Sequence, residues 1–348
     1  MRAEINSTAA GSLETKPLEV PAMPARVLID LRTDCNLKCP MCVVHGATDE
    51  PRLKSFLRRS MSLAQSRKIL DEIMHARPMI QPNLWSEPLL AHDFKEHVRA
   101  MKERGFPVTL NTNGLLLNEK TAEFFVEIKL DSIAISIDAT TPETLKKVRG
   151  IDKLDKIKRG IFNMLRARGE LEFPRIGVSF TLQPENEHER DEFVAAWGPL
   201  VDFVRVAELF KDGQFPNMRP TGPRLPCPTL YSTLPIHVDG TAVICCLDGF
   251  AETNMGNVLE RGVQEVWHGP EFTEIRRYHE TGQWDKVPFC KNCDRWSSHV
   301  FEEVEEGDYL VRRSPEFTYY NRLARLDSWT SELRDAHQQE SGGGNLGT

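Results

Sequence analysis

The sequence lacks long hydrophobic runs, has no excess of positive charge and contains few cysteines. No apolar stretch approaches the ~18 residues of a membrane-spanning helix. With 44 Lys and Arg against 51 Asp and Glu, the net charge of −7 gives no support for nucleic acid or an anionic membrane as a partner. Eight cysteines in 348 residues are far fewer than a secreted disulfide scaffold carries. In a reducing cytoplasm, clustered cysteines instead indicate metal binding or catalysis.

Residues 1–25 lack the hydrophobic core of a signal peptide and contain one early arginine. We therefore expect a flexible leader on a cytoplasmic protein. The composition, 40% hydrophobic and 27% charged, is ordinary for a globular protein, and the length suggests about two domains.

Between residues 26 and 210, short apolar runs alternate six times with helical stretches. This pattern predicts an α/β fold with parallel strands and helices packed outside them. The predicted strands are Val27–Leu31, Ile80–Trp85, Val108–Asn111, Ser132–Ile137, Ile176–Thr181 and Phe203–Ala207. The predicted helices are Ser62–Ala76, Asp93–Arg104, Asn118–Ile128, Pro142–Val148, Leu154–Arg168 and Glu187–Gly198. Such crossovers close most easily into a full or partial barrel, and a flat doubly wound sheet is the alternative. No Gly-x-Gly-x-x-Gly motif follows the first strand, so a dinucleotide-binding fold has no motif support.

The pattern changes after residue 210, where a linker rich in Pro and Gly leads into a small α+β domain over residues 220–300. Asp239-Gly240 predicts a β-hairpin between Leu234–Val238 and Thr241–Leu247, and helices are expected near 263–268 and 271–280. In residues 301–348, the acidic run at 302–308 is expected to face solvent. Apolar residues at helical spacing predict a C-terminal helix within Pro315–His337, followed by a frayed tail.

The first cysteine group, Cys35, Cys39 and Cys42, has the spacing C-x3-C-x2-C in the loop after the first strand. Three thiolates on one loop can hold three irons of a four-iron cluster. The fourth iron then keeps an open position, as catalytic metal sites do. The alternative is a zinc site completed by His45.

The second group, Cys227, Cys245, Cys290 and Cys293, has the spacing C-x17-C-x44-C-x2-C and suits a closed site with four ligands. Spacing alone leaves zinc and a four-iron cluster equally open. Cys246 is left over, and on a strand its side chain would point opposite to Cys245. It is either a small buried apolar residue or a free thiol facing a substrate.

These residues resemble the radical S-adenosylmethionine (SAM) enzymes. Met41 precedes the third cysteine of the first group, and Ser86-Glu87-Pro88 resembles the Gly-Glu-Pro motif of that family, with Ser where Gly is usual. Residues 111–114 and 136–139 resemble the ends of the family's third and fourth strands. Residues 234–246, 255–267 and 290–296 resemble the auxiliary-cluster module called SPASM, in its shortened Twitch form. The resemblance covers about residues 26–296.

The resemblance implies a partial (β/α)6 barrel over residues 26–210, followed by the auxiliary-cluster domain. It implies SAM, a SAM-binding [4Fe-4S] cluster on the first cysteine group, and a second [4Fe-4S] cluster on the other group. The backbone of Ser86, Glu87 and Pro88 would hold the SAM amino group. The other candidate SAM-binding residues are Ser136 and Asp138 for the carboxylate or ribose, Asn113 for support, Met41 against adenine and Arg149 for a carboxylate. Each has a structural alternative as a strand-end cap, a core residue or an exposed helix-end arginine.

The resemblance further implies that a radical derived from SAM takes a hydrogen atom from a substrate carbon. Epimerisation with Cys246 returning the hydrogen is the favoured hypothesis. Dehydrogenation through the auxiliary cluster and peptide modification are alternatives, as are a non-catalytic iron–sulfur electron carrier and a zinc-stapled binding protein. Many peptide-modifying relatives carry a longer N-terminal domain, so we expect a small sugar-like metabolite as substrate, with flavodoxin or ferredoxin as reductant.

Overall fold

Six parallel strands that are neighbours in chain order form the main body of the protein. The computed structural model describes residues 18–46, 50–220, 222–299, 301–330 and 333. The strands are β1 (Arg26–Ile29), β2 (Met79–Gln81), β3 (Thr109–Thr112), β4 (Ser132–Ser136), β5 (Arg175–Leu182) and β6 (Phe203–Glu208). Parallel registers join them, and the bridge between Ile80 and Val108 links β2 to β3. The predicted partial (β/α)6 barrel is confirmed.

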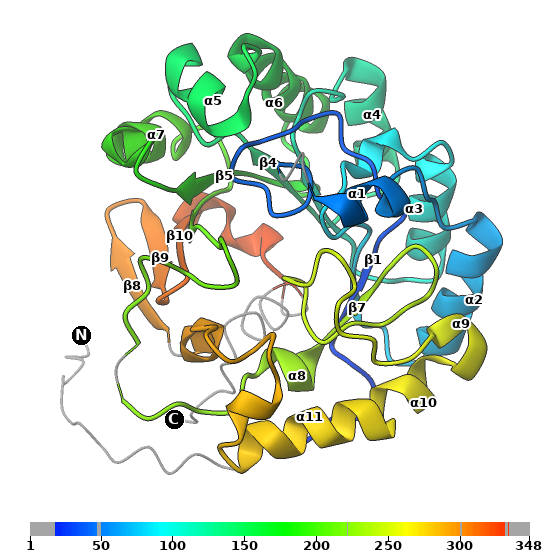
Figure 1. Ribbon diagram of the computed structural model, residues 1–348. Helices are drawn as coiled ribbons and strands as arrows, with labels where there is room; N and C mark the ends of the chain where they lie inside the picture. Colours follow the sequence, from blue (N-terminus) through cyan, green and yellow to red (C-terminus); the bar gives the residue numbers. More distant parts are fainter. Residues whose placement is uncertain (1–17, 47–49, 221, 300, 331–332, 334–348) are drawn as a thin grey trace, which may run out of the picture.

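Helices cover the outer face of these strands (Figure 1). They are α2 (Leu63–Ile73), α3 (Phe94–Glu103), α4 (Glu119–Glu127), α5 (Pro142–Arg149), α6 (Leu154–Arg168) and α7 (Arg190–Trp197). Helix α2 shows why they form: Ser62 and Gln65 make a reciprocal capping box, and Ile69, Leu70 and Ile73 are buried against the strands. All six helical stretches expected from the sequence are present. Among the described residues, we find no helix with both the length and the apolar character needed to cross a membrane.

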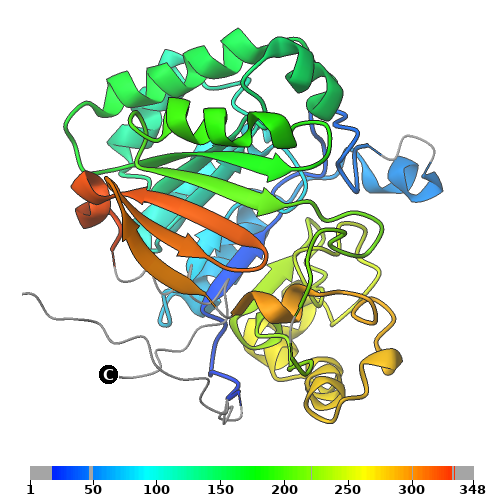
Figure 2. The same cartoon turned by 90° about the vertical axis from the view of Figure 1, so that its left-hand side faces the viewer.

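Segments from later in the chain cover both outer edges of the parallel strands. On one side, β7 (Thr233–Ile236) pairs in parallel with β1. On the other, β10 (Phe317–Arg322) pairs antiparallel with β6 and continues into β9 (Tyr309–Arg313) and β8 (Glu302–Glu306). Figure 2 shows this orange hairpin continuing the sheet beside the green strands. The pairing satisfies backbone groups that an open edge would leave exposed.

The predicted helix within Pro315–His337 is wrong for residues 317–322, which form β10 and lead into the short 3-10 segment η5 (Leu323–Ser328). Of residues 331–337, Leu333 alone is described, and it is helical. Alternating aromatic residues suit a strand as well as a helix, and the open edge of β6 decides between them because tertiary pairing outweighs local propensity. The acidic residues 302–306 are exposed, as expected, although they form β8. The residues of the predicted tail after Gln338, and those of the predicted leader up to residue 17, lie outside the described ranges.

The segment between residues 222 and 299 is irregular with short helices. These are α8 (Thr229–Ser232), α9 (Val258–Arg261), α10 (Val263–Trp267), α11 (Pro270–Glu280), η3 (Trp284–Lys286) and η4 (Arg295–His299). The predicted turn at Asp239-Gly240 is present, with Gly240 at a φ of 87°. The second arm of the predicted hairpin makes only isolated bridges, while the first arm, β7, joins the barrel sheet. Strand β7, which the sequence predicted as part of the small domain, therefore joins that domain to β1 of the barrel.

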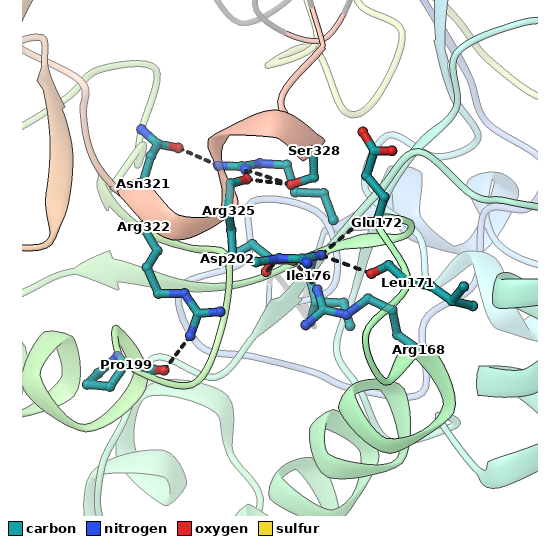
Figure 3. A network of polar contacts seen from close by, with 11 residues as sticks. Arg168, Leu171, Glu172, Ile176, Pro199, Asp202, Asn321, Arg322, Arg325 and Ser328 are labelled. Atoms are coloured by element: carbon teal, nitrogen blue, oxygen red, sulfur yellow. Dashed lines mark hydrogen bonds and ion pairs between the residues drawn. The ribbon is translucent and has the colours of Figure 1, made fainter.

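A polar network closes the amino ends of β5 and β6 (Figure 3). The Asp202 carboxylate is buried and pairs with Arg168 on α6 and, at 2.9 Å, with Nε of Arg325 on η5. It also accepts a 2.7 Å hydrogen bond from the Ile176 amide. Nearby, Arg175 donates to Asn321 Oδ1 at 2.7 Å. The C-terminal segment thus seals this end, and the carboxyl ends of the strands remain available for a site, as in other barrels of this kind.

Candidate active site

A cavity of about 330 Å³ lies at the carboxyl ends of the barrel strands. The loops after β1, β2 and β3, the ends of β4 and β6 and the C-terminal end of α5 all contribute to it. The predicted site residues that line it are Cys35, Cys39, Met41, Cys42, Ser86, Glu87, Asn113, Ser136 and Arg149. The fold therefore collects into one cavity side chains spread over more than a hundred residues of sequence.

The loop with Cys35, Cys39 and Cys42 is held by its own backbone. The Cys42 amide donates to the Cys39 carbonyl at 2.8 Å, and the Gly46 amide donates to the Cys42 carbonyl at 3.0 Å. A Cβ atom on Gly46 would lie 2.4 Å from the Cys39 carbonyl oxygen, so this turn needs glycine. Backbone amides of Leu37 and His45 point at the sulfurs of Cys35 and Cys42, at 3.4 and 3.3 Å. Such donors stabilise thiolates, which suits cluster ligands.

The thiols of this loop suit metal ligands. Burial raises the pKa of Cys35 to about 12, so an ionised thiolate here requires a positive partner such as iron. A four-iron cluster takes each thiolate on a different iron. His45, which the zinc alternative would use as the fourth ligand, lines the same cavity.

Ser86, at the position where the family motif has glycine, has a structural partner. Its hydroxyl donates to Asp30 Oδ1 at 2.6 Å, and the Leu84 amide donates to the same oxygen at 3.2 Å. Asp30 follows β1 and is 1% exposed, and burial raises its pKa to about 7. The serine hydroxyl thus satisfies a buried carboxyl group beside the cavity.

Glu87 ties the ends of β2 and β3 together. Its carboxylate accepts 2.8 Å hydrogen bonds from the Thr112 hydroxyl and the Asn113 amide. Burial raises its pKa to about 7. Pro88 begins the 3-10 segment η1 (Pro88–Leu90) and does not line the cavity. The structure therefore gives the Glu87 side chain a scaffolding role.

Asp138 holds Arg149 in place. Its carboxylate is fully buried, accepts from Arg149 Nε at 2.7 Å and accepts from the Thr181 amide at 2.7 Å. Arg149 lines the cavity and Asp138 does not. Of these two candidates, Arg149 therefore faces the cavity, and Asp138 holds Arg149 from behind it.

Three further candidates line the cavity with supporting contacts. Ser136 Oγ accepts from Ser179 at 3.2 Å. Asn113 Nδ2 donates to Asn36 Oδ1 at 2.7 Å. Met41 Sδ accepts from Gln183 Nε2 at 3.0 Å.

The four cysteines of the second group line a separate cavity of about 20 Å³. Cys227, Cys245 and the pair Cys290 and Cys293 come from three segments far apart in sequence. Burial raises the pKa of Cys227, Cys290 and Cys293, and a hydrogen bond with Cys246, together with burial, raises that of Cys245. Arg224 and Arg295 also line this cavity and supply positive charge. Four thiols, of which Cys245 is buried and the others are partly buried, surround this small space and fit a closed cluster site.

Cys246 lines neither cavity. Its sulfur accepts a 3.0 Å hydrogen bond from Arg295 Nη1 and lies within hydrogen-bonding reach of the Cys245 thiol. The prediction that the two cysteines point in opposite directions is wrong, because this segment forms no strand and the alternation of side chains does not apply. The Cys246 carbonyl accepts a 2.9 Å hydrogen bond from Trp85 Nε1, and Trp85 lines the main cavity.

Sequence reasoning missed one part of the main cavity wall. This part contains Arg205 and Glu208 of β6, Phe210 just after β6, Phe215 from the predicted linker, and Glu316 before β10. Glu208 sits directly after a predicted strand, a position that favours site residues in barrels. Glu316 carries no such signal, because its segment was expected to be helical.

The barrel and the two cysteine sites define an iron–sulfur protein with one open and one closed site. A model of the radical SAM superfamily matches residues 31–196, and a model of the SPASM iron–sulfur cluster-binding domain matches residues 227–294. The chain belongs to the radical SAM superfamily and carries a SPASM domain. These domains imply SAM, a SAM-binding [4Fe-4S] cluster and an auxiliary cluster.

Similar proteins with curated names differ among themselves. A probable GTP 3′,8-cyclase of Saccharolobus solfataricus is 30% identical over 194 residues, which cover 54% of this chain and 59% of the relative. An Fe-coproporphyrin III synthase of Methanosarcina barkeri is 25% identical over 176 residues, which cover 50% of this chain and 39% of the relative. The chain thus spans less than two thirds of the length of these relatives.

Solved structures share the fold at low sequence identity. BtrN in complex with AdoMet and 2-DOIA has a TM-score of 0.52 and 17% identity, covering 83% of this chain and 98% of BtrN. The protein anSMEcpe with bound AdoMet has a TM-score of 0.58 and 15% identity, covering 90% and 98%. SuiB of Streptococcus suis bound to its precursor peptide SuiA has a TM-score of 0.56 and 18% identity, covering 74% and 67%.

Proposed function

We propose that this protein is a radical SAM dehydrogenase that oxidises a secondary alcohol of a small polar metabolite to a ketone. The observation that supports this choice is the Glu208 carboxylate in the cavity wall. Its Oε2 atom is buried and accepts no hydrogen bond within the described residues. Cys246, the one cysteine outside the two predicted ligand groups, lines neither cavity. The wall thus offers a proton acceptor rather than a hydrogen-atom donor.

When bound, the reduced cluster and SAM supply a 5′-deoxyadenosyl radical that takes a hydrogen atom from the substrate carbon. To become a ketone, the substrate must then lose its hydroxyl proton and one electron. In this proposal Glu208 takes the proton, and burial raises its pKa, which makes it a stronger base than an ordinary carboxylate. The auxiliary site, which would receive the electron, is next to the cavity, since Leu247 lines both.

The cysteine side of the cavity would hold SAM. The Arg149 guanidinium, fixed by Asp138, fits the carboxylate of SAM, because arginine pairs with carboxylates through two parallel hydrogen bonds. Ser136 and Asn113 offer polar groups beside it, and Met41 an apolar one. The Glu87 carboxylate keeps the ends of β2 and β3 in register.

The side formed by β6 and its neighbouring residues would hold the substrate. The cavity as a whole, about 330 Å³, is at the low end of pockets for small molecules. Glu208, Glu316 and Arg205 suit hydroxyl and amino groups, and Phe210 and Phe215 add apolar surface. These features favour a sugar or aminocyclitol over a peptide. BtrN, which shares the fold, was solved with 2-DOIA, and SuiB with a peptide, so the fold admits both kinds of ligand.

The electron that starts the reaction would come from flavodoxin or ferredoxin. The eight cysteines are all free of disulfides. Free thiols and oxygen-sensitive clusters suit the reducing cytoplasm, where we place the protein.

Epimerisation through Cys246 is the second candidate. Cys246 directly precedes Leu247 of the cavity wall, and its carbonyl is bonded to Trp85 of the same wall. A thiol this close could return a hydrogen atom to the substrate if its segment shifted.

The test is an anaerobic reaction of the reconstituted, reduced protein in D2O with a panel of aminocyclitols and aminosugars. The measured quantities are 5′-deoxyadenosine and the mass of the product. Dehydrogenation yields a product lighter by two hydrogen atoms, and epimerisation yields one that carries a deuterium at carbon. We expect Glu208→Gln to lower ketone formation by about 10²-fold or more and Cys246→Ala to leave it unchanged. A deuterated epimer that disappears in Cys246→Ala would establish the second candidate instead.

A further inference from the structure

Glu316 brings a carboxylate to the main cavity from a part of the chain that neither family model covers. The matched residues end at 196 and 294. Glu316 directly precedes β10 and is 4% exposed, and its side chain lines the cavity. Its carbonyl accepts a 2.9 Å hydrogen bond from the Glu208 amide, so the pairing of β10 with β6 fixes its position.

Arg295 connects this carboxylate to the auxiliary site. It follows Cys293 by two residues, is 7% exposed and lines the auxiliary cavity. Its Nε atom lies 3.3 Å from Glu316 Oε2, and its Nη1 atom donates to Cys246 Sγ at 3.0 Å. One buried guanidinium therefore touches both a carboxylate of the substrate cavity and a thiol beside the auxiliary cysteines.

Charges in this position act strongly on a cluster. Water screens them little because both side chains are buried, so Coulomb interactions are stronger than at a surface. The potential of an iron–sulfur cluster depends on nearby charge and on hydrogen bonds to its sulfur ligands. A positive charge favours the reduced, more negative cluster, and a negative charge opposes it.

We propose that the Glu316–Arg295 ion pair is an electrostatic link between the substrate cavity and the auxiliary cluster. Arg295 raises the reduction potential of that cluster, and Glu316 partly cancels this effect. A substrate hydroxyl or amino group that binds Glu316 shares its negative charge, which leaves more of the Arg295 charge acting on the cluster. The auxiliary cluster then becomes a better electron acceptor when the cavity is filled. This inference deepens the proposed dehydrogenase function, but it depends only on the presence of the auxiliary cluster.

The test measures the midpoint potential of the auxiliary cluster in the full-length reconstituted protein by an EPR-monitored redox titration without substrate. The signal of the auxiliary cluster is assigned from a Cys35→Ala/Cys39→Ala/Cys42→Ala variant, which retains only that cluster. Glu316→Gln should shift the potential to more positive values, and Arg295→Gln should shift it to more negative values. The potential of the SAM-binding cluster should stay close to the wild-type value in both.

Glu303→Gln is the matched control, because Glu303 pairs with Arg312 in the same hairpin and lines neither cavity. It should leave both potentials unchanged. If Arg295→Gln loses the auxiliary cluster, Arg295→Lys keeps the charge and should remain near the wild-type potential. Shifts of the same sign in Glu316→Gln and Arg295→Gln, or shifts no larger than in Glu303→Gln, would overturn the link. These outcomes are independent of the ketone assay, so the proposed function and this link can fail separately.

Discussion

The two cysteine sites of this protein are assembled in opposite ways. Cys35, Cys39 and Cys42 lie on one short loop, beside a cavity of about 330 Å³. The cysteines of the auxiliary site come from positions 227 to 293 and surround only about 20 Å³. Because the three cysteines of the open site come from one loop, the other segments around them are free to form a cavity. A site gathered from distant segments has its ligands on all sides and is closed.

The charges around the two sites also differ. Carboxyl groups bonded to neutral donors, Asp30 and Glu87, flank the cysteine loop. Guanidinium groups, Arg224 and Arg295, flank the auxiliary cysteines. Both cavities have two arginines in their walls, but among the described residues only the main cavity adds carboxyl groups, those of Glu87, Glu208 and Glu316. This contrast fits the proposal that the open site binds a cofactor and a substrate and that the closed site accepts an electron.

Removal of a cysteine from the open site should have the largest effect. Cys39→Ala should reduce 5′-deoxyadenosine formation to the level of a reaction without protein, because the three-thiolate site is destroyed. Iron should fall from about eight to about four atoms per chain, since each cluster holds four. Iron analysis and chromatography of the SAM products measure both. An unchanged iron content would contradict the assignment of this loop.

Removal of a cysteine from the closed site should separate SAM cleavage from product formation. Cys290→Ala should also lower iron to about four atoms per chain, but some 5′-deoxyadenosine should still form while ketone is lost. It should lower the midpoint of thermal unfolding more than Cys39→Ala does, because the auxiliary cluster joins distant segments. Cys246→Ala is the matched control and should keep about eight irons. Loss of four irons in Cys246→Ala would mean that Cys246, and not Cys245, is a ligand of the auxiliary cluster.

The buried carboxyl groups of the open site should make stability depend on pH. Burial raises the pKa of Asp30 from 3.8 to about 7. The unfolded chain then releases this proton at lower pH than the folded chain, so the free energy of unfolding falls as pH rises through this range. The loss is at most about 1.4 kcal/mol per pH unit for one group. Asp30→Asn should flatten this slope in urea unfolding of the metal-free protein between about pH 5 and about pH 7.

Asp71→Asn provides the control for this slope, because Asp71 lies exposed on α2 and pairs with Arg104 at 2.7 Å. It should keep the wild-type slope. An equal change in both variants would mean that burial of Asp30 is not the cause.

The smallest effect is expected at Ser86. Ser86→Ala should lower the free energy of unfolding by about 1–2 kcal/mol, because Asp30 loses a buried hydrogen bond. The same change in an Asp30→Asn background should cost a different amount, since the two residues are coupled. Urea unfolding of the four proteins gives the coupling energy. Equal costs in both backgrounds would show that the serine acts through other contacts.

Much of the barrel could be predicted because each strand and helix carries its own local pattern. The residues of the open site could also be predicted, since they follow strand ends whose order the alternation establishes. Glu316 and the C-terminal strands could not, because the spacing of Phe317, Tyr320, Leu323 and Leu326 fits a helix and the choice depends on the free edge of β6. One signal was available: Gly307-Asp308 lies between two strand-like runs and forms the turn from β8 to β9, with Gly307 at a φ of 57°.

The placement of Cys246 could not be predicted for a similar reason. Strand alternation assigns directions to neighbouring side chains only where a strand forms, and the chain bends at this point. Likewise, Asp138 resembles a ligand-binding residue in sequence, and only the folded chain shows that Arg149 occupies its carboxylate.

The covering of both sheet edges by late segments has a consequence for synthesis. Strand β1 leaves the ribosome first, but its outer partner β7 follows roughly 200 residues later. At usual elongation rates that interval is about 10–40 s. Strand β6 likewise has no outer partner until β10 has been synthesised. The outer edges of β1 and β6 therefore stay unpaired until β7 and β10 have been synthesised. The three cysteines of the open site follow β1 and so lie next to one of these unpaired edges.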